Sequence, residues 1–136
     1  MGRIVGIDYG LKRVGLAVTD PLQIIASPLE TVAASQILTY LQQYCQAETV
    51  DAFVVGFPKN LDNSDTHATQ PVKNFTKQLQ KQFKQPVYLE DERFTSKMAL
   101  DAMIAGGTSK KYRRQKGSID KVSATIILQS YLEKKL

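Results

Sequence analysis

Carboxylates are the side chains with which this sequence can build a chemical site. Asp8 lies in the segment GIDYG (residues 6–10), three acids follow one another at 90–92, and Asp120 lies in the segment GSID. His67 is the single histidine and Cys45 the single cysteine. Metal sites built from several His or Cys residues are therefore excluded, as are nucleophilic sites that need a second histidine.

Three carboxylates that converge would favour a metal ion. Like charges repel and raise each other's pKa values unless a cation lies between them. Mg²⁺ or Mn²⁺ accepts oxygen ligands, and two such ions about 4 Å apart can activate a water for phosphodiester cleavage. Each acid also has a simpler explanation: a turn at Asp8, a solvated strand end at 90–92, and a helix N-terminus at Asp120.

Five strands and four helices are expected to position these acids. Alternating or continuous apolar segments predict strands, and apolar residues at helical spacing predict helices. The strands are expected at 3–9, 14–19, 23–32, 51–58 and 86–92, and the helices at 34–47, 69–84, 95–105 and 118–136. A polar loop is expected between the last two helices, at 106–117. In the last helix, the apolar residues expected to be buried are Ile119, Val122, Ile126 and Ile127.

The order of these elements predicts one α/β domain over residues 1–136. The first three strands follow one another as hairpins, which gives antiparallel pairing, whereas the later helical crossovers give parallel pairing. The expected product is a five-stranded mixed sheet with helices on both faces, similar in outline to a ribonuclease H-like fold. The first strand is central in such a sheet, so strand ends and a helix start can meet at one edge.

A basic segment precedes the third acid. The formal charge of the chain is +5, and residues 110–116 (KKYRRQK) hold five of its 18 Lys and Arg residues and no acid. This concentration favours a polyanionic partner such as a nucleic acid, although a solvated loop is the simpler explanation. The basic side chains that could contact a phosphate backbone are Lys110, Lys111, Arg113, Arg114, Lys116 and, in the first hairpin, Arg13.

The apolar segments are too short for a membrane. No run approaches the roughly 20 residues that would span a bilayer, and the opening MGRIVGIDYG lacks the apolar region of a signal peptide. We therefore expect a cytoplasmic protein without a membrane partner.

Four segments, in this order and at these spacings, resemble the YqgF family. They are GIDYGLKRVGLAVTD, GFPKNLDNS, DERFTS and IDKVSATIILQSYL, and the resemblance covers essentially the whole chain. The family consists of small bacterial RuvC-like proteins of ribonuclease H fold, named as candidate Holliday junction resolvases and candidate nucleases for the 5′ end of 16S ribosomal RNA. The resemblance implies a metal-dependent nuclease whose ligands are Asp8, Glu92 and Asp120, with Asp91 as second choice to Glu92. It favours pre-ribosomal RNA over a four-way DNA junction.

Further residues are expected to support this site. Gly6 lies two positions before the acid of GIDYG, where a missing side chain would leave room for an anionic ligand. Gly10 supplies the turn of the first hairpin. Arg93 and Thr95, together with Arg13, would support the metal site or contact a phosphate.

Two other functions remain open at this point. An actin-like ATPase or phosphotransferase also begins with Asp-x-Gly, but such a protein closes two domains around its nucleotide. A non-catalytic RNA- or protein-binding module would keep the basic residues and tolerate loss of the acids. The oligomeric state is open too, between a monomer and a weak homodimer, because a junction resolvase makes paired cuts as a dimer and an RNA-trimming enzyme can act alone.

Overall fold

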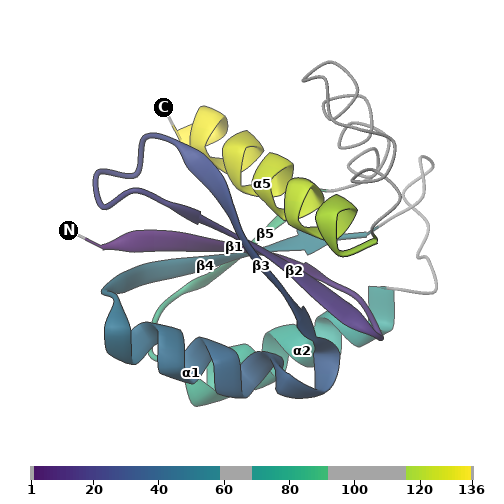
Figure 1. Cartoon of the computed structure of the whole chain (residues 1–136). Coiled ribbons are helices and arrows are strands. Elements are labelled where there is room, and N and C mark those ends of the chain that lie inside the picture. The colour runs from purple at the N-terminus through teal and green to yellow at the C-terminus, as the bar shows by residue number, and fades with distance from the viewer. Residues whose placement is uncertain (1, 59–68, 92–115, 136) are drawn as a thin grey trace.

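The computed structural model describes residues 2–58, 69–91 and 116–135 (Figure 1). Its elements follow the expected order. They are β1 (Arg3–Tyr9), β2 (Arg13–Thr19), β3 (Ala26–Ala33), a short 3-10 turn (Ala34–Gln36), α1 (Ile37–Ala47), β4 (Val50–Phe57), α2 (Thr69–Gln82), β5 (Val87–Asp91) and α5 (Lys116–Lys135). The helix expected at 95–105 lies outside the described residues. The last helix begins at Lys116, two residues before the expected start.

The five strands form one mixed sheet in the order β3-β2-β1-β4-β5. β1 pairs antiparallel with β2 and β2 with β3, whereas β1–β4 and β4–β5 are parallel, so the expected topology and the central place of β1 are confirmed. The outer strand β3 carries an irregularity, because Leu16 pairs with Glu30 and the next residue, Ala17, pairs with Pro28. Proline suits this edge, since it has no N–H to donate to a neighbour.

Each face of the sheet is covered by helices (Figure 1). On one face, α1 and α2 pack over alternate strand residues such as Val5, Ile7 and Val55. The apolar side chains that α2 buries follow the expected helical spacing and are Val72, Phe75 and Leu79. Tyr9 stacks on Phe75 with ring centroids 4.4 Å apart, so this tyrosine belongs to the packing of that face.

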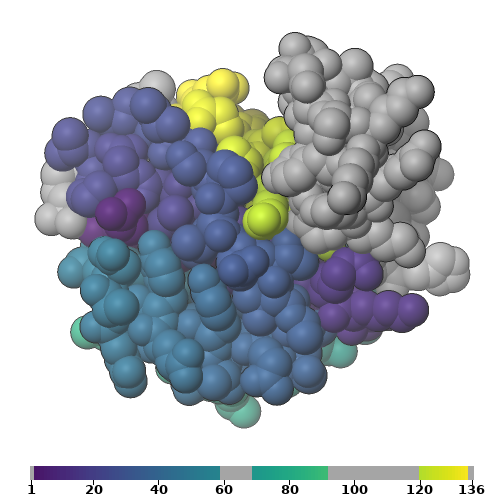
Figure 2. Space-filling view, viewed as in Figure 1, coloured from purple at the N-terminus to yellow at the C-terminus, as the bar shows by residue number. Residues whose placement is uncertain are grey.

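The other face is covered by α5 alone among the described helices. Its buried apolar residues contact the intervening strand positions and are Ala124, Ile127, Leu128 and Leu132. Val122 and Ile126, which were expected to be buried, are only half-buried. In the space-filling view, α5 surfaces as a yellow-green strip beside the blue residues of β3 (Figure 2). No described helix is both long enough and apolar enough to cross a bilayer.

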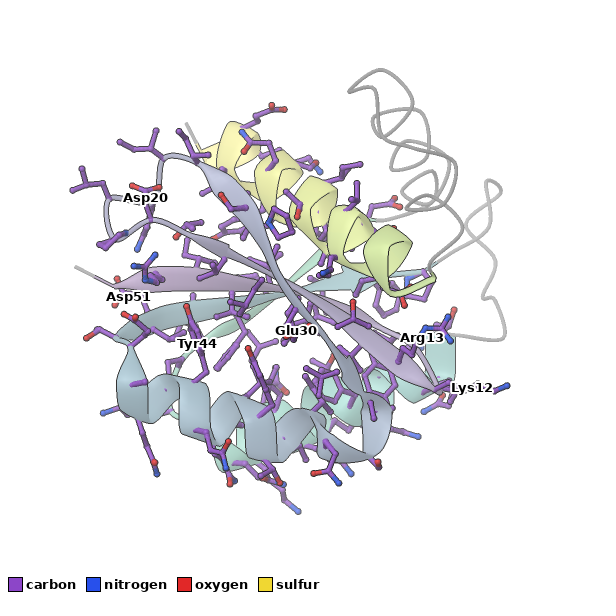
Figure 3. The ribbon with its side chains drawn as sticks, viewed as in Figure 1. Lys12, Arg13, Asp20, Glu30, Tyr44 and Asp51 are labelled. Atoms are coloured by element: carbon purple, nitrogen blue, oxygen red, sulfur yellow. The ribbon has the colours of Figure 1, made fainter. Side chains whose placement is uncertain are left out.

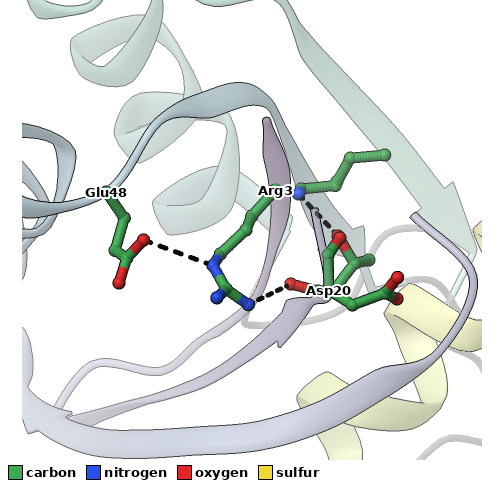
Figure 4. Close-up of polar contacts among 5 residues, drawn as sticks. Arg3, Asp20 and Glu48 are labelled. Atoms are coloured by element: carbon green, nitrogen blue, oxygen red, sulfur yellow. Dashed lines mark hydrogen bonds and ion pairs between the residues drawn. The ribbon is translucent and has the colours of Figure 1, made fainter. Parts of the chain in front are cut away.

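Structural contacts occupy the sheet end where β1 begins (Figure 4). Arg3 donates from Nη1 to the Thr19 carbonyl at 3.0 Å and approaches Glu48 Oε2 at 3.5 Å through Nε. Asp20 accepts the backbone N–H groups of Ile24 and Ile25 at 2.9 and 2.8 Å. Asp20 and Glu48 therefore have structural partners at this end, whereas Asp8 lies near the opposite end of β1.

Candidate catalytic site

Asp8 lies near the end of β1 on the face covered by α5. Side chains alternate along a strand, and Ile4 belongs to the cluster beneath α5 whereas Ile7 belongs to the cluster beneath α1 and α2. Asp8 therefore shares the face of Ile4, beyond the buried part of the strand, and its side chain is half-buried. Asp8 therefore lies where the sequence predicted it, near the end of the central strand.

Asp120 is brought to the same place by the first turns of α5. Gly15 is the register partner of Asp8 in the β1–β2 hairpin. A Cβ added at Gly15 would lie 2.0 Å from the carbonyl oxygen of Asp120 and 2.9 Å from its Cβ. The backbone of Asp120 thus rests on the strand position directly beside Asp8, which places the start of α5 next to the end of β1.

Arg13 pairs with Asp120 at this point. Its Nε donates to Asp120 Oδ2 at 2.9 Å, and the two side chains are 39% and 23% exposed. Arg13 precedes Gly15 by two residues and so lies on the same face, diagonal to Asp8. Diagonal neighbours across antiparallel strands are about 7–8 Å apart, within reach of a long side chain. Figure 3 shows Arg13 at the sheet end beneath the start of α5, with Lys12 extending away from it.

Glu90 lies at the same level of the sheet as Asp8, two strands away. β4 and β5 pair Gly56 with Glu90, and Gly56 follows the residue that pairs with Ile7. Two strand spacings separate the backbones of Asp8 and Glu90 by about 10 Å. Glu90 faces α5, since its carboxylate is 4% exposed and accepts a hydrogen bond from Lys134 on that helix.

The pairing of Glu90 with Lys134 has an electrostatic consequence. The hydrogen bond to Glu90 raises the pKa of Lys134, and the negative charge of Glu90 adds to the effect. Lys134 is the cation that the described structure places on Glu90. Tyr88, two residues earlier, stacks on Tyr131 with centroids 5.5 Å apart.

Asp91 is placed on the other face. It pairs with Phe57, which packs against the cluster beneath α1 and α2, and its side chain is exposed. The described structure therefore does not bring Asp91, the second choice for a ligand, to the face that carries Asp8.

Several predicted site residues lie outside the described part of the chain. They are Glu92, Arg93, Thr95, Lys110, Lys111, Arg113 and Arg114. Lys116 is the first residue of α5. Within residues 2–58, 69–91 and 116–135, no three His, Cys, Asp or Glu residues form a ready metal-binding group, and the predicted third acid is not among those residues.

Gly6 and Gly15 allow α5 to pack closely on the sheet, whereas Gly10 lies in the turn of the first hairpin. Gly6 was expected to leave room for a ligand, and this expectation is wrong, because a Cβ there would lie 2.8 Å from Leu128 Cβ and 3.1 Å from the Ala124 carbonyl oxygen. Gly10 fits its expected turn role, since an added Cβ would lie 2.6 Å from the Arg13 carbonyl oxygen. Gly15 was not predicted to matter, although a glycine inside a strand pattern does signal a close backbone approach.

Two solved structures with this fold carry descriptions that refer to Holliday junctions. RuvC from Thermus thermophilus in complex with a Holliday junction substrate aligns with a TM-score of 0.58 at 19% identity, covering 99% of this chain and 96% of that one. The fowlpox virus Holliday junction resolvase aligns with a TM-score of 0.59 at 14% identity, covering 97% and 99%. At these identities the likeness establishes the ribonuclease H-like fold.

Relatives found by sequence share a much higher identity with this chain. A protein of Amoebophilus asiaticus named as a candidate pre-16S rRNA nuclease is 56% identical over 133 residues, covering 97% of this chain and 94% of that protein. One of Phocaeicola vulgatus with the same name is 48% identical over 136 residues, covering 99% and 98%. The family model described as RuvX, Holliday junction resolvase, matches residues 2–134. The chain therefore belongs to the RuvX family, in agreement with its YqgF-like motifs.

Proposed function

We propose that this protein is a metal-dependent nuclease that hydrolyses phosphodiester bonds at the 5′ side of pre-16S ribosomal RNA in the cytoplasm. One observation carries the proposal: the backbone of Asp120 rests on Gly15, the register partner of Asp8, so two acidic residues from a strand and a distant helix are neighbours. The names of the relatives from Amoebophilus asiaticus and Phocaeicola vulgatus support pre-16S rRNA as the substrate.

The donor set fits a hard divalent cation. Asp8 and Asp120 offer carboxylate oxygens, the ligands that Mg²⁺ and Mn²⁺ accept, and neither histidine nor cysteine is needed. In this proposal Asp8, Asp120 and Glu92 hold the metal. When bound, such an ion supplies an activated water and stabilises charge on the leaving oxygen.

Basic residues would hold the substrate beside these acids. Arg13 lies on the same face of the sheet as Asp8, and the segment 110–116 ends at Lys116, the first residue of α5, which carries Asp120. Lysine and arginine contacts to phosphates release counterions, so the affinity for RNA would fall steeply as salt is added. In the proposal these side chains orient the backbone, and the acids determine where it is cut.

A second candidate substrate is a four-way DNA junction. The description of the matching family model, Holliday junction resolvase, is the observation that favours it. A resolvase makes paired cuts related by two-fold symmetry and would act as a dimer. The same acids would perform the chemistry, so substrate and oligomeric state separate the two candidates.

The test is a cleavage assay with labelled substrates. Single-stranded RNA carrying the 5′ leader of pre-16S rRNA, and a four-way DNA junction, are incubated with Mg²⁺ or Mn²⁺. Asp8→Asn removes a proposed ligand, whereas Asp51→Asn is the matched control. Asp51 lies in β4 at the other sheet end, where its carboxylate accepts the N–H of Gly2 at 3.0 Å.

The outcomes separate the alternatives. The proposal expects metal-dependent cleavage of RNA that Asp8→Asn abolishes and Asp51→Asn preserves. Cleavage of the junction instead would make DNA the substrate. If neither substrate is cut, and both variants bind RNA as the natural chain does, the protein is a binding module and the catalytic proposal is wrong.

A further inference from the structure

The ion pair between Arg13 and Asp120 places a cation on a proposed metal ligand. We infer that the Arg13 guanidinium neutralises Asp120 while no metal is bound, and that metal binding releases it to contact a substrate phosphate. This inference rests on the proposed function, because it needs Asp120 to be a metal ligand. It gives Arg13 two alternating partners, one before and one after the metal arrives.

The position of Arg13 suits this exchange. Its side chain shares a face with Asp8 and contacts Asp120 through Nε and Oδ2 at 2.9 Å. A divalent cation drawn to Asp8 and Asp120 would compete with the guanidinium for the Asp120 carboxylate, which Arg13 contacts at Oδ2. The ion pair is open to solvent, with 39% and 23% of the two side chains exposed, and ion pairs of this kind are weak enough to exchange.

The released group would stay near the site because its backbone is fixed. Arg13 pairs with Ala33 in the β2–β3 ladder, and the neighbouring Lys12 carbonyl accepts the N–H of Ala34 at 3.0 Å. Only the side chain has to rotate. A guanidinium presents several N–H donors in one plane, a geometry that matches phosphate oxygens.

The helix does not need this ion pair to hold its place. The start of α5 rests on Gly15, and its later turns are anchored by the buried residues Ala124, Ile127 and Leu128. A partly exposed ion pair adds little to such an anchor. A functional explanation of the Arg13–Asp120 contact is therefore stronger than a purely structural one.

The experiment measures Mn²⁺ binding without any substrate, by the loss of the free-ion electron paramagnetic resonance signal. Arg13→Gln is compared with Lys12→Gln, which removes the same charge from the adjacent exposed residue. Without its competitor, Asp120 should bind Mn²⁺ about 2–5-fold more tightly in Arg13→Gln, the range that a partly exposed ion pair can supply. General electrostatics should change the Lys12→Gln affinity less than about 2-fold. Arg13→Lys keeps the charge, and we expect an affinity between those of the natural chain and Arg13→Gln.

A second readout follows the released guanidinium. RNA binding is measured against salt, in Ca²⁺ and in a chelator. In Ca²⁺, Arg13→Gln should reduce the slope of log affinity against log salt by roughly one, the value for one lost phosphate contact. In the chelator, Arg13→Gln and the natural chain should have the same slope, because Arg13 is then paired with Asp120 and does not contact RNA.

Failure of this inference is distinguishable from failure of the proposed function. Equal Mn²⁺ affinity in the natural chain, Arg13→Gln and Arg13→Lys would overturn the competition between Arg13 and the metal and leave the metal site intact. Equal tightening in Lys12→Gln would overturn it as well, because the effect would then be one of net charge. A natural chain that binds no Mn²⁺ would overturn both proposals together. Urea unfolding of each variant ensures that folded proteins are compared.

Discussion

Replacing Gly15 with alanine should displace the helix that carries Asp120. The added Cβ would lie 2.0 Å from the Asp120 carbonyl oxygen, and ordinary contacts begin near 3.4 Å. The start of α5 must therefore move by about 1.4 Å, the difference between these two distances. Overpacking costs about 1–3 kcal/mol, and we expect about 3 kcal/mol here because the displaced atom belongs to a helix backbone.

Such a cost is a large part of a total stability of about 5–15 kcal/mol. Its effect on catalysis should be of similar size, because a displacement of about 1 Å in a catalytic group can reduce the rate about 100-fold, which corresponds to about 2.7 kcal/mol in the activation free energy. Urea unfolding measures the first effect, and Mn²⁺ binding with RNA cleavage measures the second. The experiment therefore tests whether the Gly15 contact sets the position of Asp120 as well as the stability of the fold.

Gly2→Ala is the matched control for the alanine substitution. Its new Cβ would meet the side chains of Asp51 and Thr49 at the far end of the sheet, and exposed side chains can rotate away. We expect its unfolding free energy to stay within about 1 kcal/mol of the natural value. The reasoning is refuted if Gly15→Ala changes the unfolding free energy by less than about 0.5 kcal/mol and leaves Mn²⁺ binding intact.

Three further predictions concern other parts of the molecule. Lys134→Met should destabilise the fold because the Glu90 carboxylate, 4% exposed, loses its cation, and adding Glu90→Gln should recover most of the loss in a double-mutant cycle. Backbone hydrogen bonds from the loop after β2, first that of Ile25, lower the pKa of Asp20 from 3.8. Its stabilising contribution is thus present above about pH 4 and lost as the pH falls through the lowered value; Asp20→Asn should flatten thermal-melting profiles over that range. Burial raises the pKa of the Cys45 thiol, so a disulfide reagent at about pH 8 should modify Cys45 more slowly in folded than in urea-unfolded protein.

Local patterns in the sequence predicted the strands and the amphipathic helices. The apolar segments of β1 and β4 and the spacing of Val72, Phe75 and Leu79 in α2 depend on nearby residues and on the period of each element. The order of hairpins and crossovers then made β1 central, which placed Asp8 at the sheet edge. This part of the fold and of the site could be predicted without any knowledge of long-range contacts.

Contacts between distant residues could not be predicted in the same way. The Arg13–Asp120 and Glu90–Lys134 pairs join residues 107 and 44 positions apart, and no local pattern indicates either partner. The residues that α5 buries also differ from those predicted from the positions of its apolar residues. Gly6 lets α5 approach the sheet closely, and the small residue Ala124 is fully buried there. Ile126 is two residues further along the helix, on another side of it, and is only half-buried.

The long separation between Arg13 and Asp120 also has a kinetic meaning. The β1–β2–β3 hairpins join neighbouring residues and can form early, whereas the contact of α5 with Gly15 closes a loop of about one hundred residues and bears a greater entropic cost. Asp8 can therefore reach its native position in the hairpins before Asp120 reaches Gly15. Under the proposed function, a partly folded chain has an incomplete set of acids and leaves the RNA around it uncut, so nuclease activity requires that the long-range contact between α5 and Gly15 has formed.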